Sequence, residues 1–265
     1  NIKYQIDISN SHPLLLNALI YEKYGIRQNS LKSAKTQTQT NKSTSTIYDI
    51  TKIIISYIEE ENKEGNNSKY NVEKYICNKL KNIGLDPSEI DKIRKIPFDV
   101  LKYIYLTSTG QFWDNVLKGD NSKVGGYDLI RQDTKEIMFA QVFYGKNLRE
   151  KSNYKHAKRF KEEFPNVYSL ILSYKKGLEK EERTVLAHKL MALESKLFRE
   201  ALRRLFEMGY EVVSIHDAIV VLDTPANTNC SIEIVENVLK DVYRNEGLVC
   251  KCSVDIYGEK AKELA

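Results

Sequence analysis

Two aspartates stand where the surrounding sequence would let a carboxylate do chemistry. Asp7 closes an alternating segment at residues 2–8, and Asp217 lies where the β-rich segments YEVVSI and AIVVLD meet. Taken singly, each is also an ordinary strand-end or turn residue. Two strand-borne carboxylates from distant positions could, however, converge on a hard divalent cation such as magnesium, which prefers oxygen ligands. Two such ions would activate an attacking hydroxyl and stabilise a leaving pyrophosphate.

A second set of residues recurs every four positions within a helix-like run over 127–145, so its members fall along one helical face. The set comprises Arg131, Lys135, Phe139 and Phe143. Two cations one turn apart can grip a triphosphate, and aromatic rings further along can stack on a base. The alternative interpretation is a basic surface that runs into a hydrophobic core contact, and the spacing alone favours that alternative.

The elements that would carry the two aspartates are predicted clearly. Residues 2–8 alternate between apolar and polar side chains, as in a half-buried strand. Apolar residues recur every three or four positions from 186 to 205, which predicts a long amphipathic helix that ends at Gly209. A strand–turn–strand hairpin follows, then a helix over 231–246 and a last strand over 248–258.

The long middle of the chain is predicted to be largely helical. Residues 29–46 carry almost no apolar side chain, so a mobile loop is expected there. Apolar stripes follow at helical spacing over 50–58 and 72–80, and Pro87 and Pro97 each begin a short helix. This part of the chain would therefore contribute helices and not strands.

The composition limits the class of protein. The chain has 265 residues and a net charge of +5. Such a charge mildly favours an anionic partner such as nucleic acid, although it is also common on a solvated surface. The sequence has no apolar run of about 18 residues and no signal peptide, so neither a membrane span nor a membrane partner is expected. The four cysteines form no CxxC pair, which is typical of reduced thiols in a cytoplasmic protein.

Five short segments resemble motifs of the family A polymerases, a group that includes the phage-type single-subunit RNA polymerases. All five occur in the order of that family, and residues 14–130 offer only suggestive helices and a GQFW segment. The five segments are DISNSHP at 7–13 (motif A), RQDTKEIMFAQVFYG at 131–145 (motif B), FKEEFPNV at 160–167, SIHDAIVV at 214–221 (motif C) and SVDIYGEK at 253–260. No single segment is decisive, whereas the ordered set is fairly specific.

The resemblance implies an α+β fold. Its expected parts are a polymerase palm, which is an antiparallel sheet backed by helices, and a largely helical fingers subdomain. Residues 1–13 would form the palm strand with motif A, and residues 14–185 the fingers with motif B and the loop at 29–46. Residues 186–265 would complete the palm with the motif C hairpin and the terminal strand.

The resemblance also implies roles in metal and primer binding. Asp7 and Asp217 match the two metal-binding aspartates of the family, and the carbonyl of Ile8 is a further expected metal ligand. His216 matches the residue that approaches the primer terminus. The implied cofactor is a pair of Mg²⁺ ions, with Mn²⁺ as the alternative metal.

The nucleotide-binding residues implied by the resemblance include the helical face described above. They are His12, Arg131, Lys135, Phe139, Phe143 and Tyr144. Phe143 keeps the helical spacing, whereas the tyrosine of the motif comes one residue later, so either Phe143 or Tyr144 can fill that role. His12 stands five residues after Asp7, where the DNA polymerases carry the Glu that blocks a ribose 2′-hydroxyl. Sugar selection is therefore open.

Two further departures bear on catalysis and architecture. Ala218 follows the motif C aspartate, where the DNA polymerases usually carry a Glu, although the RNA polymerases lack that Glu as well. The interval from Asp7 to Lys135 is longer than is usual in the family, and the interval from Lys135 to Asp217 is shorter. The fingers are therefore expected to be rebuilt, with the extra mass placed before motif B.

The function implied by the resemblance is template-dependent DNA synthesis in phage or plasmid replication, by a nucleotidyltransferase that adds nucleotides to a primer 3′-hydroxyl. The partners would be primer–template nucleic acid and nucleoside triphosphates. The family's thumb precedes motif A, so a thumb on a preceding segment or an accessory protein is expected. One alternative is a polymerase-like nucleic-acid-binding or replication-accessory module without catalysis, suggested by Ala218. The other is a template-independent nucleotidyltransferase or an RNA polymerase.

Overall fold

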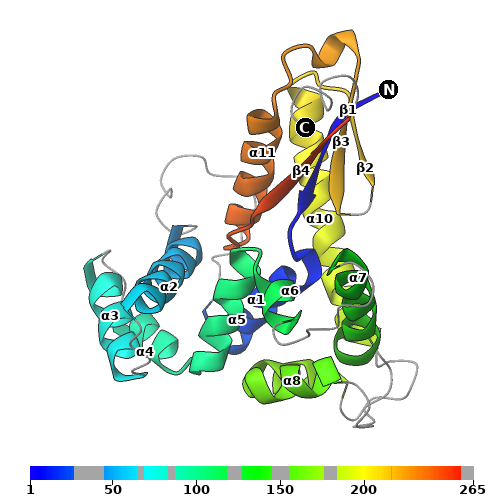
Figure 1. Cartoon of the computed structure of the whole chain (residues 1–265). Coiled ribbons are helices and arrows are strands. Elements are labelled where there is room, and N and C mark those ends of the chain that lie inside the picture. Colours follow the sequence, from blue (N-terminus) through cyan, green and yellow to red (C-terminus); the bar gives the residue numbers. More distant parts are fainter. Residues whose placement is uncertain are drawn as a thin grey trace.

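The computed structural model shows an α+β protein with a small antiparallel sheet and many helices (Figure 1). The fold class is therefore confirmed at that level. The structure describes residues 1–26, 45–64, 69–82, 87–117, 127–144, 155–175, 184–215 and 217–257. The loop predicted at 29–46 lies outside the described residues except for its last two positions, which begin helix α2 (Ser45–Glu64).

The sheet has four strands in the order β2-β3-β1-β4, and each neighbouring pair is antiparallel. The strands are β1 (Ile2–Ile8), β2 (Val212–Ile215), β3 (Ala218–Leu222) and β4 (Cys252–Ile256). The alternation predicted for β1 is confirmed, because Tyr4, Ile6 and Ile8 are buried on one side of the strand. The hairpin and the last strand are confirmed as well. Strands from both ends of the sequence therefore meet in one sheet.

Two helices pack against the sheet and against each other. They are α10 (Val185–Glu207) and α11 (Ile232–Asn245). The long amphipathic helix predicted from its apolar spacing is α10. It ends at Glu207 and is followed by Gly209, whose φ of 85° is a left-handed conformation that glycine adopts without strain. Ser231 caps α11 by accepting a hydrogen bond from the backbone N–H of Ile234 at 3.3 Å.

The other helices lie beyond one end of the sheet (Figure 1). They are α1 (Ser11–Lys23), α2, α3 (Lys69–Asn82), α4 (Pro87–Arg94), α5 (Phe98–Ser108), α6 (Phe112–Leu117), α7 (Tyr127–Met138), α8 (Lys155–Glu163) and α9 (Pro165–Ser173). In Figure 1, α2 to α4 lie on one side of α1, α5 and α6, α7 lies on the other, and α8 lies below α5 and α6 in this view. No helix in the described part of the chain is long and apolar enough to cross a membrane.

Helix α1 links the sheet to the helical part. It follows β1 directly and packs against both α5 and α10. Buried hydrogen bonds fix it to α5: the Tyr103 hydroxyl donates to the carbonyl of Pro13 at 2.8 Å, and Asn17 Nδ2 donates to Thr107 Oγ1 at 2.9 Å. The buried apolar side chains form one continuous cluster across both parts. Residues at the β1–α1 junction are therefore fixed in place by the sheet and by the helical part together.

Candidate functional site

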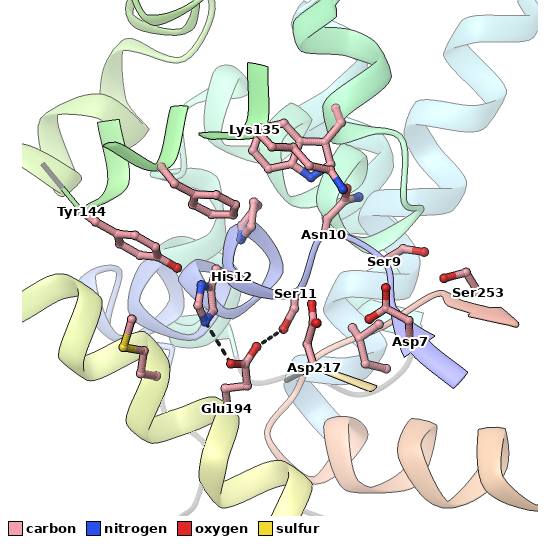
Figure 2. Close-up of a pocket in the computed structure, with 15 residues that line it drawn as sticks. Asp7, Ser9, Asn10, Ser11, His12, Lys135, Tyr144, Glu194, Asp217 and Ser253 are labelled. Carbon is pink, nitrogen blue, oxygen red and sulfur yellow. Dashed lines mark hydrogen bonds and ion pairs between the residues drawn. The ribbon is translucent and has the colours of Figure 1, made fainter. Parts of the chain in front are cut away.

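A cavity of about 520 Å³ opens at the junction of β1 and α1. Figure 2 shows that its walls come from the sheet end, from α10 and from the region of α6 and α7. The lining residues are Asp7, Ile8, Ser9, Asn10, Ser11, His12, Pro13, Trp113, Lys135, Phe139, Tyr144, Met191, Glu194, Asp217 and Ser253. Most of the residues singled out from the sequence therefore lie around one cavity.

The two aspartates meet at the sheet end of this cavity (Figure 2). Asp7 is opposite Ala218 on β3 and opposite Ser253 on β4. The backbone N–H of Ile8 donates to the carbonyl of Asp217 at 3.3 Å, which fixes the hairpin tip beside the end of β1. Antiparallel register alone thus brings together two residues that are distant in sequence.

At both aspartates the effect of burial outweighs the nearby positive charge of Lys135, so their pKa values are raised. Burial, followed by the charge of Asp217, raises the pKa of Asp7 to about 7. Burial also raises the pKa of Asp217, and the charge of Glu194 adds to that effect. Asp7 Oδ1 is buried and has no hydrogen-bond partner among the described residues. A strongly perturbed acid in a cavity, as Asp7 is here, is typical of functional sites.

The donor set fits a magnesium ion. In the described part of the chain, no group of three or more His, Cys, Asp or Glu residues is placed to hold a metal. Magnesium, however, is commonly bound by one or two carboxylates together with substrate phosphates and water. Asp7 and Asp217 supply such a pair, and the unpartnered oxygen of Asp7 is available as a ligand. Ile8, whose carbonyl was an expected ligand, also lines the cavity.

The opposite wall carries the basic and aromatic residues predicted on one helical face. Lys135 and Phe139 both line the cavity. Lys135 Nζ lies 6.0 Å from the centre of the Trp113 ring, within the range of a cation–π contact. Arg131 lies on α7 one turn before Lys135, and its side chain falls outside the described residues, as does the whole of His216.

The predicted helical face is interrupted after Phe139. A π-helical turn, η1, runs from Phe139 to Phe143, and the N–H of Tyr144 donates to the carbonyl of Phe139 at 2.7 Å. Because this turn is wider than an α-helical turn, the positions after it rotate relative to α7. Phe143 consequently lies in the core, with no exposed surface, and does not line the cavity. Of the two residues considered for this position, Phe143 therefore lies away from the cavity.

Tyr144 occupies the cavity instead. Its ring stacks on that of Phe139, with centroids 5.1 Å apart and planes 10° apart. The Tyr144 hydroxyl is buried and has no hydrogen-bond partner within the described ranges. Trp113, which the sequence did not indicate as a site residue, meets Phe139 edge-on at 5.5 Å. The cavity therefore has a stacked aromatic wall that faces the carboxylate end.

A buried lysine ties down the π-helical turn. Lys175 follows α9 and is almost completely buried, and its Nζ donates to the carbonyl of Val142 at 2.6 Å. Burial lowers the pKa of Lys175 to about 8. A wide helical turn leaves backbone carbonyls in need of partners, and a buried ammonium needs an acceptor. The hydrogen bond from Lys175 to Val142 satisfies both the carbonyl and the ammonium. Lys175 therefore stabilises the turn that places Tyr144 in the cavity.

Glu194 is the main site residue that the sequence did not reveal. It projects from α10 to the N-terminus of α1 (Figure 2). Its Oε1 accepts a hydrogen bond from Ser11 Oγ at 2.5 Å, and its Oε2 lies 3.1 Å from His12 Nε2. One signal was present: Glu194 stands four residues from both Leu190 and Phe198, which are buried on the apolar side of α10.

Asn10 is a further cavity residue that only the structure reveals. It precedes α1 and adopts a left-handed conformation, with φ of 60°. Its side chain lines the cavity at 7% exposure, and neither amide atom has a hydrogen-bond partner in the described part of the chain. Buried amides are usually hydrogen-bonded. Asn10 is an exception, and it lies at the β1–α1 junction on the lining of the cavity.

Comparison with known proteins yielded no match: no protein-family model, no curated protein and no solved structure matched the chain. The case for a function therefore rests on the residues of the cavity.

Proposed function

We propose that this chain is the palm-and-fingers core of a nucleotidyltransferase resembling the family A polymerases, which adds nucleotides to a primer 3′-hydroxyl. The observation that carries the proposal is the composition of the cavity. Asp7 and Asp217 lie at its sheet end, and Lys135 lies on the opposite wall beside Phe139 and Tyr144. Acidic metal ligands, a phosphate-binding cation and a stacking surface are the three needs of nucleotidyl transfer.

In this proposal Asp7 and Asp217 hold Mg²⁺, or Mn²⁺ in its place. When bound, the metal would supply two effects: a lower pKa of the attacking hydroxyl and compensation of phosphate charge. Lys135 neutralises charge on the β- and γ-phosphates, together with Arg131 one turn earlier. The stacked rings hold the base. The contribution of the protein is then positioning and fixed electrostatics, as in other phosphoryl transfers.

The order of groups around the cavity agrees with the order of groups in a nucleotide. Phosphates belong beside the carboxylates and Lys135, and the base belongs on Phe139 and Tyr144. His12 lies between these two regions (Figure 2), with its ring edge-on to both aromatic rings at 6.0 and 5.4 Å. A sugar would therefore lie next to His12.

The sheet offers a surface for the primer–template duplex next to this cavity. Val213 and Ile215 are 42% and 49% exposed on β2. The strand register places Ile215 opposite Ala218, which is opposite Asp7, so these residues share one face of the sheet. This is the face opposite to the one that carries Tyr4 and Ile6. A palm sheet with its carboxylates on the open face is the finer fold assignment that the proposal includes.

Primer extension tests the proposal. With magnesium, primer–template and the four deoxynucleotides, the wild-type protein is expected to extend the primer, whereas Asp7→Asn and Asp217→Asn are not. Asp223→Asn is the matched control, because Asp223 is exposed just after the other end of β3. Full activity in both site variants would refute the two-metal assignment.

Two results would point to the other functions. Binding of primer–template without a magnesium requirement and without incorporation would indicate an accessory module. Incorporation on a single-stranded primer, with each nucleotide supplied separately, would indicate template-independent addition.

A further inference from the structure

The N-terminus of α1 is braced by a side chain from α10. Glu194 Oε1 accepts a hydrogen bond from Ser11 Oγ at 2.5 Å, and Glu194 Oε2 lies 3.1 Å from His12 Nε2. The side chains of His12 and Glu194 are only 16% and 18% exposed. A carboxylate that is shared between two neighbours in this way holds both in one orientation.

The contact with Glu194 also selects the tautomer of the His12 ring. An ionised carboxylate can only accept hydrogen bonds, so the nitrogen that faces Glu194 must donate. Nε2 therefore carries a hydrogen, and in the neutral ring Nδ1 is the acceptor. The edge-on contacts of the ring with Phe139 and Tyr144 restrict its rotation further.

We propose that Glu194 is a positioning residue which, by holding the ring and the tautomer of His12, makes His12 the acceptor for a hydroxyl of the bound nucleotide's sugar. The proposal rests on the proposed function and adds a determinant of sugar specificity to it. A site built to accept a hydrogen bond from a hydroxyl discriminates against the analogue that lacks it. The hydroxyl can be the 2′ or the 3′ group, and the choice of nucleotides in the test separates the two.

A double-mutant cycle tests the coupling between the two residues. Wild type, Glu194→Gln, His12→Ala and the double variant are compared by kcat/KM for a ribonucleotide, a deoxyribonucleotide and a dideoxyribonucleotide. Glutamine can donate its amide hydrogens to Nε2 and so reverse the tautomer. Two ratios of kcat/KM are compared: ribonucleotide to deoxyribonucleotide, which reports on the 2′-hydroxyl, and deoxyribonucleotide to dideoxyribonucleotide, which reports on the 3′-hydroxyl. Glu194→Gln and His12→Ala are each expected to reduce one of these ratios about tenfold, which corresponds to the loss of one hydrogen bond. The double variant is expected to lose no more than His12→Ala alone.

A second readout does not depend on activity. The chain has four histidines, so the ring nitrogens of His12 can be assigned by nitrogen-15 NMR with His12→Ala as the reference. The wild type is expected to show hydrogen on Nε2, and Glu194→Gln on Nδ1. Glu207→Gln is the matched control, because Glu207 is exposed on the same helix and pairs with Arg203. That variant should change neither the tautomer nor the nucleotide ratios.

The outcomes separate this proposal from the proposed function. If the wild type incorporates nucleotides but the effects of Glu194→Gln and His12→Ala multiply in the double variant, Glu194 does not act through His12 and the proposal is overturned. If the wild type neither binds nor incorporates nucleotides, the proposed function fails and this proposal fails with it. Should Glu194→Gln not fold, Glu194→Asp keeps the charge with a shorter arm, and unchanged ratios in that variant would count against the proposal.

Discussion

The buried asparagine side chains at the two ends of the sheet differ in their hydrogen bonding. Beyond the end of β3, Asn227 is fully buried and fully hydrogen-bonded. Its Nδ2 donates to the carbonyls of Glu211 and Leu222 at 2.6 and 2.8 Å, and its Oδ1 accepts from the N–H of Glu211 at 3.0 Å. Lys3 Nζ donates to the carbonyl of Asn227 at 2.7 Å. This end is an internally satisfied structural network.

At the other end, Asn10 is almost as deeply buried, yet neither amide atom finds a partner in the parts of the chain that the structure describes. Asp7 Oδ1 is likewise buried and has no hydrogen-bond partner among the described residues. The contrast has one exception, since Thr224 Oγ1 is buried without a partner at the satisfied end. Burial of polar groups alone therefore does not mark a site. The buried polar atoms of Asp7 and Asn10 that lack partners in the described residues line the cavity, and such exceptions call for an explanation.

The largest expected difference is between substitutions at the two ends of the sheet in their effect on the rate of primer extension. Asp7→Asn is expected to reduce primer extension by about 10³-fold, because it removes a charged ligand from the place where phosphate charge develops. Asp223→Asn, at the satisfied end, should leave the rate within about twofold. Rates measured at saturating magnesium and nucleotide check this. Equal losses in the two variants would remove the functional distinction between the ends.

Stability should show the reverse order. Asn227→Ala is expected to reduce the free energy of unfolding by about 3 kcal/mol, because it strands backbone groups of Glu211 and Leu222. Asn10→Gly removes an amide whose hydrogen bonds are not made within the described structure, and glycine adopts the left-handed φ of 60° without strain, so its cost should stay below about 1 kcal/mol. Urea denaturation of both variants against wild type decides the point. A larger loss from Asn10→Gly would show that the Asn10 side chain is structural.

Lys175 offers a pH-dependent test of the turn behind the cavity. Its pKa is about 8 in the folded protein, below the ordinary value near 10.4. Between these values the unfolded chain binds the proton and the folded protein does not, so stability rises with pH. The free energy of unfolding of the wild type should therefore rise by about 2 kcal/mol relative to Lys175→Met from pH 8 to pH 10. Parallel pH profiles would contradict a buried ammonium.

The smallest expected effect concerns the metal-free carboxylate pair. Because the pKa of Asp7 is raised to about 7, the folded protein holds a proton that the unfolded chain releases near pH 4. Stability is then present at low pH and is lost as pH rises toward 7, by about 1 kcal/mol after allowance for solvent exposure. Denaturation profiles with chelator should show this loss in wild type and not in Asp7→Asn. A flat wild-type profile would count against the shift.

The sequence predicted the elements whose pattern is local. The alternation of residues 2–8, the hairpin around Asp217 and the apolar spacing of α10 are all confirmed. Asp7 and Asp217 could be paired in advance because each lies at the end of a strand. Sheet order and register then complete what the pattern indicated.

The rest of the site depends on features that the sequence does not encode locally. The π-helical turn has no residue signature, so the spacing could not decide between Phe143 and Tyr144. Glu194 and Trp113 reach the cavity only through the packing of α10 and α6 around α1. The missing partners of Asn10 become visible only when its surroundings are known.

Metal binding tests the central claim most directly. Titration of Mn²⁺ in the presence of a nonhydrolysable nucleotide, followed by electron paramagnetic resonance, measures the affinity of the wild type, Asp7→Asn, Asp217→Asn and Asp223→Asn. The predicted result is binding in wild type and Asp223→Asn, with affinity reduced by at least about tenfold in each of the other two variants. Wild-type affinity in both Asp7→Asn and Asp217→Asn would contradict the assignment of a metal to this end of the sheet.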